Sequence, residues 1–143
     1  MPISVKRIYE SPSRSDGTRV LVDRLWPRGV SKARAKIDAW LRDLAPSDAL
    51  RHWFHARPGA WATFSKCYLK ELKDPQAASA LDQLYRLARR RKPLTLLFAS
   101  KNEEYNNAVV LKNLLDGMRK PPTGTGPGAA RALRERSARR LPR

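Results

Sequence analysis

The sequence predicts an α/β protein: a small single domain with a short, mostly parallel sheet covered by helices, and a disordered basic C-terminal tail. Residues 20–22, at the start of a predicted strand over 20–26, and residues 94–99 are apolar on both faces, as strands in the middle of such a sheet are. A long stretch with helical periodicity separates them, and a parallel connection needs a dozen or more residues. The two strands are therefore expected to point the same way.

Residues 3–9 form the first predicted strand, because β-branched and aromatic residues are frequent there. Lys6 and Arg7 interrupt its apolar pattern, which favours a position near the edge of the sheet. The serine-rich loop of residues 11–17 is too short to hold a crossover helix. It fits an antiparallel pairing of the first two strands, and it also fits an ordered loop that carries the chain across, so their relative orientation stays open.

The second strand, residues 20–26, stops at Pro27, which has no N–H to donate to a neighbouring strand. A helix is predicted from Ser31, a favourable N-cap residue, to Pro46. The apolar residues that predict it share one face at helical spacing: Ile37, Trp40, Leu41 and Leu44.

Three further helices are predicted from apolar residues at helical spacing and from their start signals. They begin at Ser47, near Pro58 and at Asp74, where an acid is followed by a proline in the first turn. The last of them ends in the basic residues 89–92. This run is interpreted as a solvated helix end that the helix dipole favours, and the alternative is a patch that contacts phosphate.

The strand at residues 94–99 is followed at once by polar residues. Ser100 and Glu103 have the spacing of a capping box, so the last helix is predicted to begin at Ser100. Gly117 is predicted to end it. Strand, polar turn and helix in this order are typical of an α/β layer, in which ligands bind at the carboxyl ends of the strands.

The chain divides into one predicted domain, residues 1–118, and a flexible Pro/Gly linker with a basic tail, residues 119–143. A length of 143 residues and 41% hydrophobic content fit a single domain with a core of ordinary size. The final stretch loses all periodicity and has only two sizeable apolar residues beyond the linker, Leu133 and Leu141. We expect a disordered basic arm there.

A net charge of +17 makes polyanions the first partners to consider. Residues 119–143 contain eight basic residues and one acidic residue, a net charge of +7, which leaves +10 for residues 1–118. The tail is therefore expected to have non-specific affinity for nucleic acid. Solubility or genomic composition explains an arginine-rich chain equally well, and charge alone does not decide between these readings.

Several classes of protein and of site are not predicted. No apolar run is long enough to span a bilayer and no signal peptide is recognisable, so we expect a cytoplasmic protein without membrane contact. Cys67 is the single cysteine, which excludes an intrachain disulfide and a cysteine metal cluster. His52 and His55 lack a third ligand nearby, so no metal site is predicted. No motif indicates a cofactor.

The candidate site lies where the two buried strands end. If these strands are parallel neighbours, the polar residues after each of them meet at one edge of the sheet. Arginine can grip a phosphate or carboxylate through two N–H groups, lysine adds a point charge, and a helix start offers unpaired N–H groups. The predicted anion-binding residues are Arg24, Arg28, Ser100, Lys101, Asn102 and Asn106.

Asp23 has two interpretations at this edge. As a catalytic residue it would act as a general base or orient a water molecule. As a structural residue it would hold Arg24 or Arg28, or accept hydrogen bonds from the N–H groups of the turn at residues 27–29. The structural interpretation is favoured, because buried arginines usually need a paired acid.

The residues also resemble a known family. Residues 19–32 carry the motif Arg-Val-Leu-Val-Asp-Arg-Leu-Trp-Pro-Arg-Gly-Val-Ser-Lys, and further matching segments lie at residues 5–9, 40–47, 53–54, 95–97 and 106–111. Together they are similar to the YeaO-like branch of the family called domain of unknown function 488, over residues 3–118. The resemblance implies a small bacterial α/β domain whose biochemical role is not established.

The resemblance also marks a departure from the family pattern. Members usually have Glu-His-Asn-His-Ala near the last helix, where this chain has Tyr105 and Asn107 in place of the two histidines. Any histidine-dependent chemistry or metal binding of relatives is therefore not carried over to this chain.

Three hypotheses follow from the sequence. The first is a module that binds a phosphate-bearing or other anionic ligand at residues 23–31 and 100–106, with a tail that adds nucleic-acid affinity. The second is an enzyme for a small phosphorylated or nucleotide substrate, with Asp23 as base. The third is a protein without chemistry that recruits partners through its tail and basic patches. The sequence does not indicate an oligomeric state.

Overall fold

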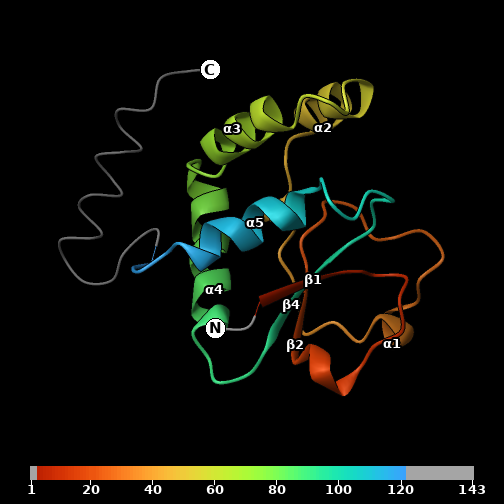
Figure 1. Cartoon of the computed structure of the whole chain (residues 1–143). Helices are drawn as coiled ribbons and strands as arrows, with labels where there is room; N and C mark the ends of the chain where they lie inside the picture. The colour runs from red at the N-terminus through yellow and green to blue at the C-terminus, as the bar shows by residue number, and fades with distance from the viewer. Residues whose placement is uncertain (1–2, 122–143) are drawn as a thin grey trace.

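The computed structural model describes residues 3–121 and has a four-stranded, all-parallel sheet flanked by helices (Figure 1), which confirms the predicted α/β class. Its strands, β1 (Ile3–Arg7), β2 (Thr18–Leu21), β3 (Ala39–Trp40) and β4 (Leu94–Phe98), are arranged in the order β1-β4-β2-β3. The helices are α1 (Lys32–Ala35), α2 (Asp48–Ala56), α3 (Trp61–Glu71), α4 (Pro75–Ala88) and α5 (Asn107–Asp116). No helix among residues 3–121 has the length and apolar character that a bilayer crossing requires.

Strand β4 lies between β1 and β2, so the first two strands are parallel but are not neighbours. Leu96 of β4 stands opposite Val5 on one side and Val20 on the other. The connection between β1 and β2 contains a single 3₁₀ turn, η1 (Arg14–Asp16), so an ordered loop carries the chain across. Gly17 ends that turn with φ 65°, and a Cβ there would lie 2.2 Å from the Pro93 carbonyl oxygen. Only glycine fits this crossing.

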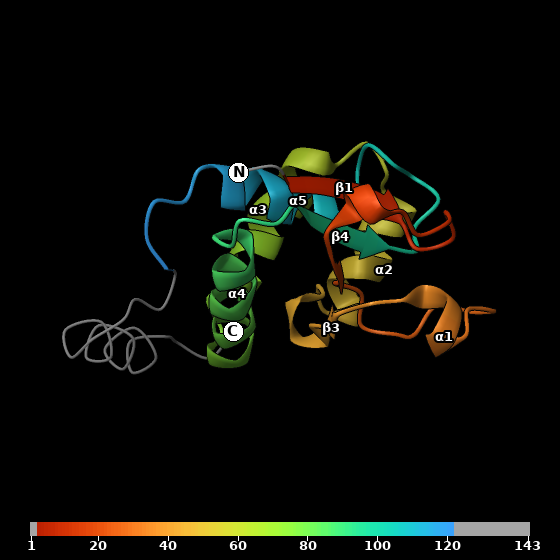
Figure 2. The same cartoon turned by 90° about the horizontal axis from the view of Figure 1, so that it is seen from below.

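The sheet separates two apolar cores. Alternate residues of β2 and β4, such as Val20 and Leu96, face the larger core under α2 to α5. Their neighbours, Leu21 and Leu97, face a smaller core under α1 and the loops around it. Both views show α4 and α1 on opposite sides of the sheet (Figures 1 and 2). Every residue of β4 is buried, as predicted for a strand covered on both faces.

The long helix predicted from Ser31 to Pro46 is wrong. Ser31 does cap a helix, but α1 ends after one turn because Lys36 adopts a left-handed conformation, φ 46°. The chain then forms β3, which pairs with β2, and a 3₁₀ turn, η2 (Arg42–Leu44). The Asp38 carboxylate accepts a hydrogen bond of 2.8 Å from the Arg19 N–H beside that pairing. The pairing with β3 covers an otherwise open edge of β2. The hydrogen bonds between these two strands outweigh the local preference of the apolar spacing for a helix.

The next three helices are confirmed by the structure. The Ser47 hydroxyl accepts from the Leu50 N–H and begins α2, and Pro75 occupies the first turn of α4 after Asp74. Helix α3 begins three residues after the predicted start near Pro58. Because local start signals and apolar spacing agree in these helices, the sequence predicts them well.

The helix predicted to begin at Ser100 is also wrong, because α5 begins at Asn107. The Asn106 side chain accepts from the Val109 N–H and provides the N-cap. Residues 100–106 form a loop instead, in which the Asn102 side chain accepts from the N–H groups of Glu104 and Tyr105. This local turn uses the groups that a helix would have needed. Gly117 ends α5 as predicted.

A buried ionic network closes the smaller core at the amino-terminal end of β2, and the sequence analysis missed it. Arg19 donates to the Asp16 carboxylate at 2.6 Å and to the Ala35 carbonyl at 2.8 Å. Burial alone raises the pKa of Asp16, but hydrogen bonds from the Ser13 N–H, Lys6 and Arg19 lower it below its usual value. The network therefore contributes stability above the ordinary pKa of 3.8, and this stability is lost as pH falls through the lowered pKa.

Candidate functional site

The candidate site lies at the carboxyl-terminal edge of the sheet, where β2 and β4 end side by side. The two strands are parallel neighbours, so the segments after them meet as predicted. Strand β2 ends at Leu21, however, and does not continue to Trp26. One more ladder bond joins the strands, from the Val22 N–H to the Leu97 carbonyl at 3.1 Å. Beyond this bond, side chains form hydrogen bonds with the backbone groups that a continued ladder would pair.

The Asp23 carboxylate makes the first of these replacements. A continued parallel ladder would pair the Ala99 N–H with the Val22 carbonyl. Instead, the Ala99 N–H donates to Asp23 Oδ2 at 2.8 Å. The Asn107 side-chain amide donates to Asp23 Oδ1 at 3.1 Å and to the Val22 carbonyl at 3.0 Å. One carboxylate thus connects the end of β2, the end of β4 and the first residue of α5.

Asp23 therefore has other partners than the predicted ones. Within residues 3–121 it forms an ion pair with neither Arg24 nor Arg28. Burial raises the pKa of the Asp23 carboxyl above its ordinary 3.8, although the bonds from Ala99 and Asn107 and the charge of Arg51 oppose that shift. The Asp23 carboxyl therefore binds its proton more tightly than an exposed acid does.

The two predicted arginines lie at this edge in different environments. Arg24 is half-buried, and one Nη atom donates to the Ala45 carbonyl at 3.2 Å. Arg28 is exposed, and its backbone carbonyl accepts from the Tyr9 hydroxyl at 3.0 Å. Among the residues that the structure describes, no carboxylate forms an ion pair with either guanidinium.

The predicted residues of the 100–106 loop divide into two kinds. Ser100, Lys101 and Asn102 are exposed, and the Ser100 hydroxyl accepts from the Asn102 N–H at 3.2 Å. Asn106 is only 4% exposed. Its side chain accepts from Val109 and donates to the Asn102 carbonyl at 2.8 Å, so both ends of this amide are used inside the protein.

Arg7 belongs to the same edge and was missed as a site residue. It ends β1, and its guanidinium donates to the Ser100 carbonyl at 2.9 Å and to the Ala99 carbonyl at 3.2 Å. The guanidinium carbon also lies 5.0 Å from the centre of the Tyr9 ring. The predicted strand ran on to residue 9, so Arg7 was placed inside it and not at its carboxyl end.

Tyr105 and Asn107, which replace the histidines of the family pattern, have separate roles. The Tyr105 ring lies 5.1 Å from the Trp61 ring and joins the loop to α3. Asn107 contacts Asp23, so the acid faces an amide that does not titrate. No group of three or more His, Cys, Asp or Glu residues that could hold a metal occurs in the described part of the chain.

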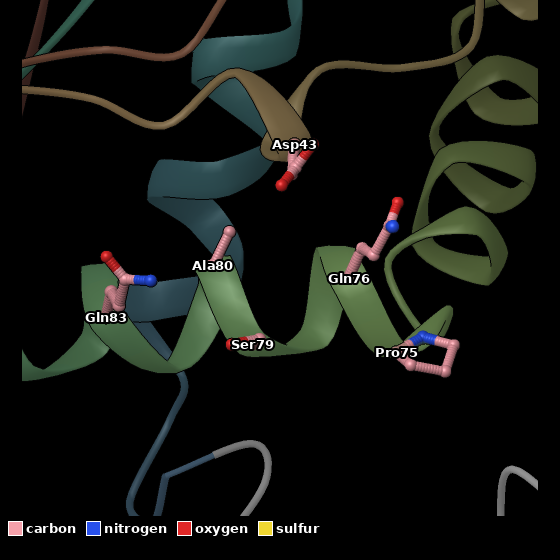
Figure 3. Close-up of a pocket in the computed structure, with 6 residues that line it drawn as sticks. All are labelled: Asp43, Pro75, Gln76, Ser79, Ala80 and Gln83. Atoms are coloured by element: carbon pink, nitrogen blue, oxygen red, sulfur yellow. The ribbon is translucent and has the colours of Figure 1, made fainter.

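Two open depressions lie away from this edge. One lies between η2 and α4, where Asp43 points toward the polar side of α4 (Figure 3); it is lined by Asp43, Pro75, Gln76, Ser79, Ala80 and Gln83. The other lies between α3 and α5, and it is lined by Trp61, Ser65, Leu69, Val110, Asn113 and Leu114. Neither contains a predicted anion-binding residue, so a ligand of the edge would bind on an open surface.

Comparison with known proteins identifies the family. The family model DUF488-N3i, described as the inactive DUF488-N3 subclade, matches residues 2–124. The chain belongs to this family. It is 42% identical to the uncharacterized protein YeaO of Escherichia coli (strain K12) over 115 residues, which are 80% of this chain and 97% of YeaO. The uncharacterized protein Rv3073c of Mycobacterium tuberculosis (strain ATCC 25618 / H37Rv) is 38% identical over 80% of this chain and 94% of its own.

These matches confirm the predicted membership in the YeaO-like branch of domain of unknown function 488. No solved structure matches this DUF488-N3i protein significantly. The family match ends at residue 124, so most of the predicted basic tail lies outside it. Residues 122–143 of that tail also lie outside the residues that the structure describes.

The first prediction concerns the Asp23 carboxylate. Asp23→Asn leaves one acceptor oxygen for two donors, so we expect the free energy of unfolding to fall by about 1–3 kcal/mol near pH 4. The folded wild type binds the Asp23 proton more tightly than the unfolded chain, so the wild type loses stability as pH rises from 3.8 to the raised pKa. The asparagine variant does not lose stability in this way. The difference in free energy of unfolding between wild type and variant therefore becomes smaller toward neutral pH.

Urea unfolding followed by tryptophan fluorescence at about pH 4 and about pH 7 measures this deficit. Asp43→Asn removes an exposed acid that has no ion-pair partner within residues 3–121 and is the matched control. We expect its effect to stay within about 0.5 kcal/mol. Equal deficits in the two variants, or an Asp23→Asn deficit that does not change with pH, would contradict the structural role.

Proposed function

We propose that this DUF488-N3i protein is a non-catalytic module that binds a phosphate-bearing or other anionic ligand at the carboxyl-terminal edge of its sheet. The observation that carries the proposal is a set of cations there that lack a carboxylate partner, although Glu103 and Glu104 belong to the same edge. Arg24, Arg28 and Lys101 form no ion pair within residues 3–121, and Asp23, the acid beside them, is engaged by Ala99 and Asn107. An anion would supply the partner that these cations lack.

The geometry of the cations supports this function. The half-buried Arg24 is fixed by its bond to the Ala45 carbonyl, and the other N–H groups of its guanidinium form no hydrogen bond within residues 3–121. The Arg28 backbone carbonyl accepts a hydrogen bond from the Tyr9 hydroxyl, which holds the backbone of this exposed residue at the edge. A guanidinium presents N–H groups in a fork that matches phosphate and carboxylate oxygens. A guanidinium that is already held, as that of Arg24 is, reduces the entropy that binding costs.

Two observations favour binding over catalysis. Both oxygens of Asp23 already accept hydrogen bonds from within the protein, and its neighbour Asn107 cannot transfer a proton at physiological pH. The family is described as the inactive DUF488-N3 subclade. A module that binds an anion at this edge and catalyses no reaction agrees with both observations.

The second candidate is an enzyme that acts on a small phosphorylated or nucleotide substrate, with Asp23 as general base. The observation that favours it is the raised pKa of this acid, because perturbed acids cluster at catalytic sites. The same Asp23→Asn variant separates the candidates. An enzyme would lose turnover while its folded structure persists, whereas in the binding module the substitution appears mainly as a loss of stability.

Binding of pyrophosphate to the full chain, measured by isothermal titration calorimetry at low salt, tests the proposal. We expect Arg24→Ala and Arg28→Ala each to weaken binding by about tenfold, because each removes charge-assisted hydrogen bonds worth roughly 1.5–3 kcal/mol. Arg90→Ala is the matched control, since Arg90 is an exposed arginine that precedes β4 and so lies at the opposite edge. Equal losses in all three variants would show charge-driven binding without a site.

We also propose that the basic tail adds non-specific affinity for nucleic acid. Residues 122–143 contain six arginines and one glutamate. Each phosphate that an arginine neutralises releases counterions, so such affinity falls steeply with salt. This contribution is additional to the edge and needs no folded structure.

Removal of residues 122–143 is expected to lower affinity for a single-stranded oligonucleotide and to flatten the plot of log affinity against log salt. The slope should fall by roughly 0.7 for each phosphate contact that is lost. The cut after Pro121 keeps Met118, which packs against the larger core. Fluorescence anisotropy at several salt concentrations measures the slope, and an unchanged slope would exclude the tail from binding.

A further inference from the structure

We propose that the ligand of this edge is single-stranded nucleic acid, whose unpaired bases contact Tyr9 and Leu25 while its phosphates contact the neighbouring cations. The inference rests on the proposed anion-binding function and names the class of ligand. It starts from two apolar side chains that the fold leaves exposed beside those cations.

Tyr9 is the first of these side chains. It is 46% exposed although it follows directly on a buried residue, Ile8. Its hydroxyl donates to the Arg28 carbonyl, and the Arg7 guanidinium lies 5.0 Å from the ring centre. The ring is thus held at two points and still presents much of its surface to solvent. A fixed, exposed ring can stack on a base with little loss of conformational entropy.

Leu25 is the second. It is 66% exposed and lies next to Arg24 in the segment that precedes α1. Pro27 is buried, and the Trp26 indole N–H donates to the Val30 carbonyl at 2.6 Å, so the two residues that follow Leu25 anchor this segment. A single exposed leucine needs no explanation. Two exposed apolar groups on anchored backbone beside unpaired arginines are a more specific arrangement.

The apolar and cationic groups are connected directly. The Tyr9 hydroxyl holds the backbone of Arg28, so a ring for bases and a cation for phosphates are joined by one hydrogen bond. Exposed aromatic rings interleaved with basic side chains are the usual surface for single-stranded nucleic acid. A small anion has no apolar surface that could contact the exposed ring and leucine. A duplex keeps the faces of its bases stacked inside the helix. An unpaired strand uses all of these groups.

The experiment compares two oligonucleotides with the same number of phosphates, about twelve, one of thymidine and one with abasic spacers. The full chain carries the same tail in every variant, so the ratio of the two affinities reports base contacts. We expect the wild type to favour the thymidine strand by a factor of about 5 to 100. Tyr9→Ala should reduce this ratio strongly, and Leu25→Ala should reduce it less. Tyr9→Phe keeps the ring but loses the hydrogen bond to Arg28, so it should retain more of this ratio than Tyr9→Ala does.

The outcomes separate this inference from the function on which it rests. If Arg28→Ala weakens binding of the abasic strand more than Arg90→Ala does, but the ratio is the same in wild type and Tyr9→Ala, the edge binds anions and the inference of base contacts is wrong. If Arg28→Ala and Arg90→Ala have equal effects on the abasic strand, the anion site itself is wrong. Tighter binding of a duplex of the same length would also overturn the inference. Circular dichroism checks that each variant is folded.

Discussion

The candidate site depends on the hydrogen bonds of the Asp23 carboxylate. This one group replaces the backbone pairing where β2 and β4 separate, and it also holds Asn107 at the start of α5. The two segments that form the edge, residues 23–30 and 100–106, leave the sheet from this point. Because a half-buried carboxylate with two donors is expensive to disturb, the edge keeps one geometry without a ligand. The backbone that carries the neighbouring cations is therefore held in one geometry.

Sequence reasoning predicted the elements whose local and global signals agree. Strand β4 is apolar on both faces and is buried on both, and Ser47 begins a helix as its residue type suggests. It failed where a long-range interaction decides. Trp40 fits a helical face, but it lies in a strand because β2 needs a partner. Ser100 and Asn106, six residues apart, are both residue types that start helices, and α5 begins after the buried Asn106.

The same limit applies to the site. Residues that follow parallel strands were placed at one edge from the sequence, since chain direction fixes which strand ends meet. The hydrogen-bond partners of these residues were not predicted, because the partners come from distant parts of the chain. Asp23 was expected to hold an arginine, yet it holds Ala99 and Asn107. Arg7 was missed because its two carbonyl partners follow β4, which is paired with β1 only in the folded sheet.

We have proposed that the cations without an ion-pair partner at this edge, Arg24 and Arg28, hold an anion. Crystals of the full chain grown with tungstate test it most directly, because the anomalous signal of tungsten locates the ion without ambiguity. We expect tungstate in contact with the guanidinium of Arg24 or Arg28. Tungstate bound at the exposed basic residues 89–92 and absent from those two side chains would contradict it.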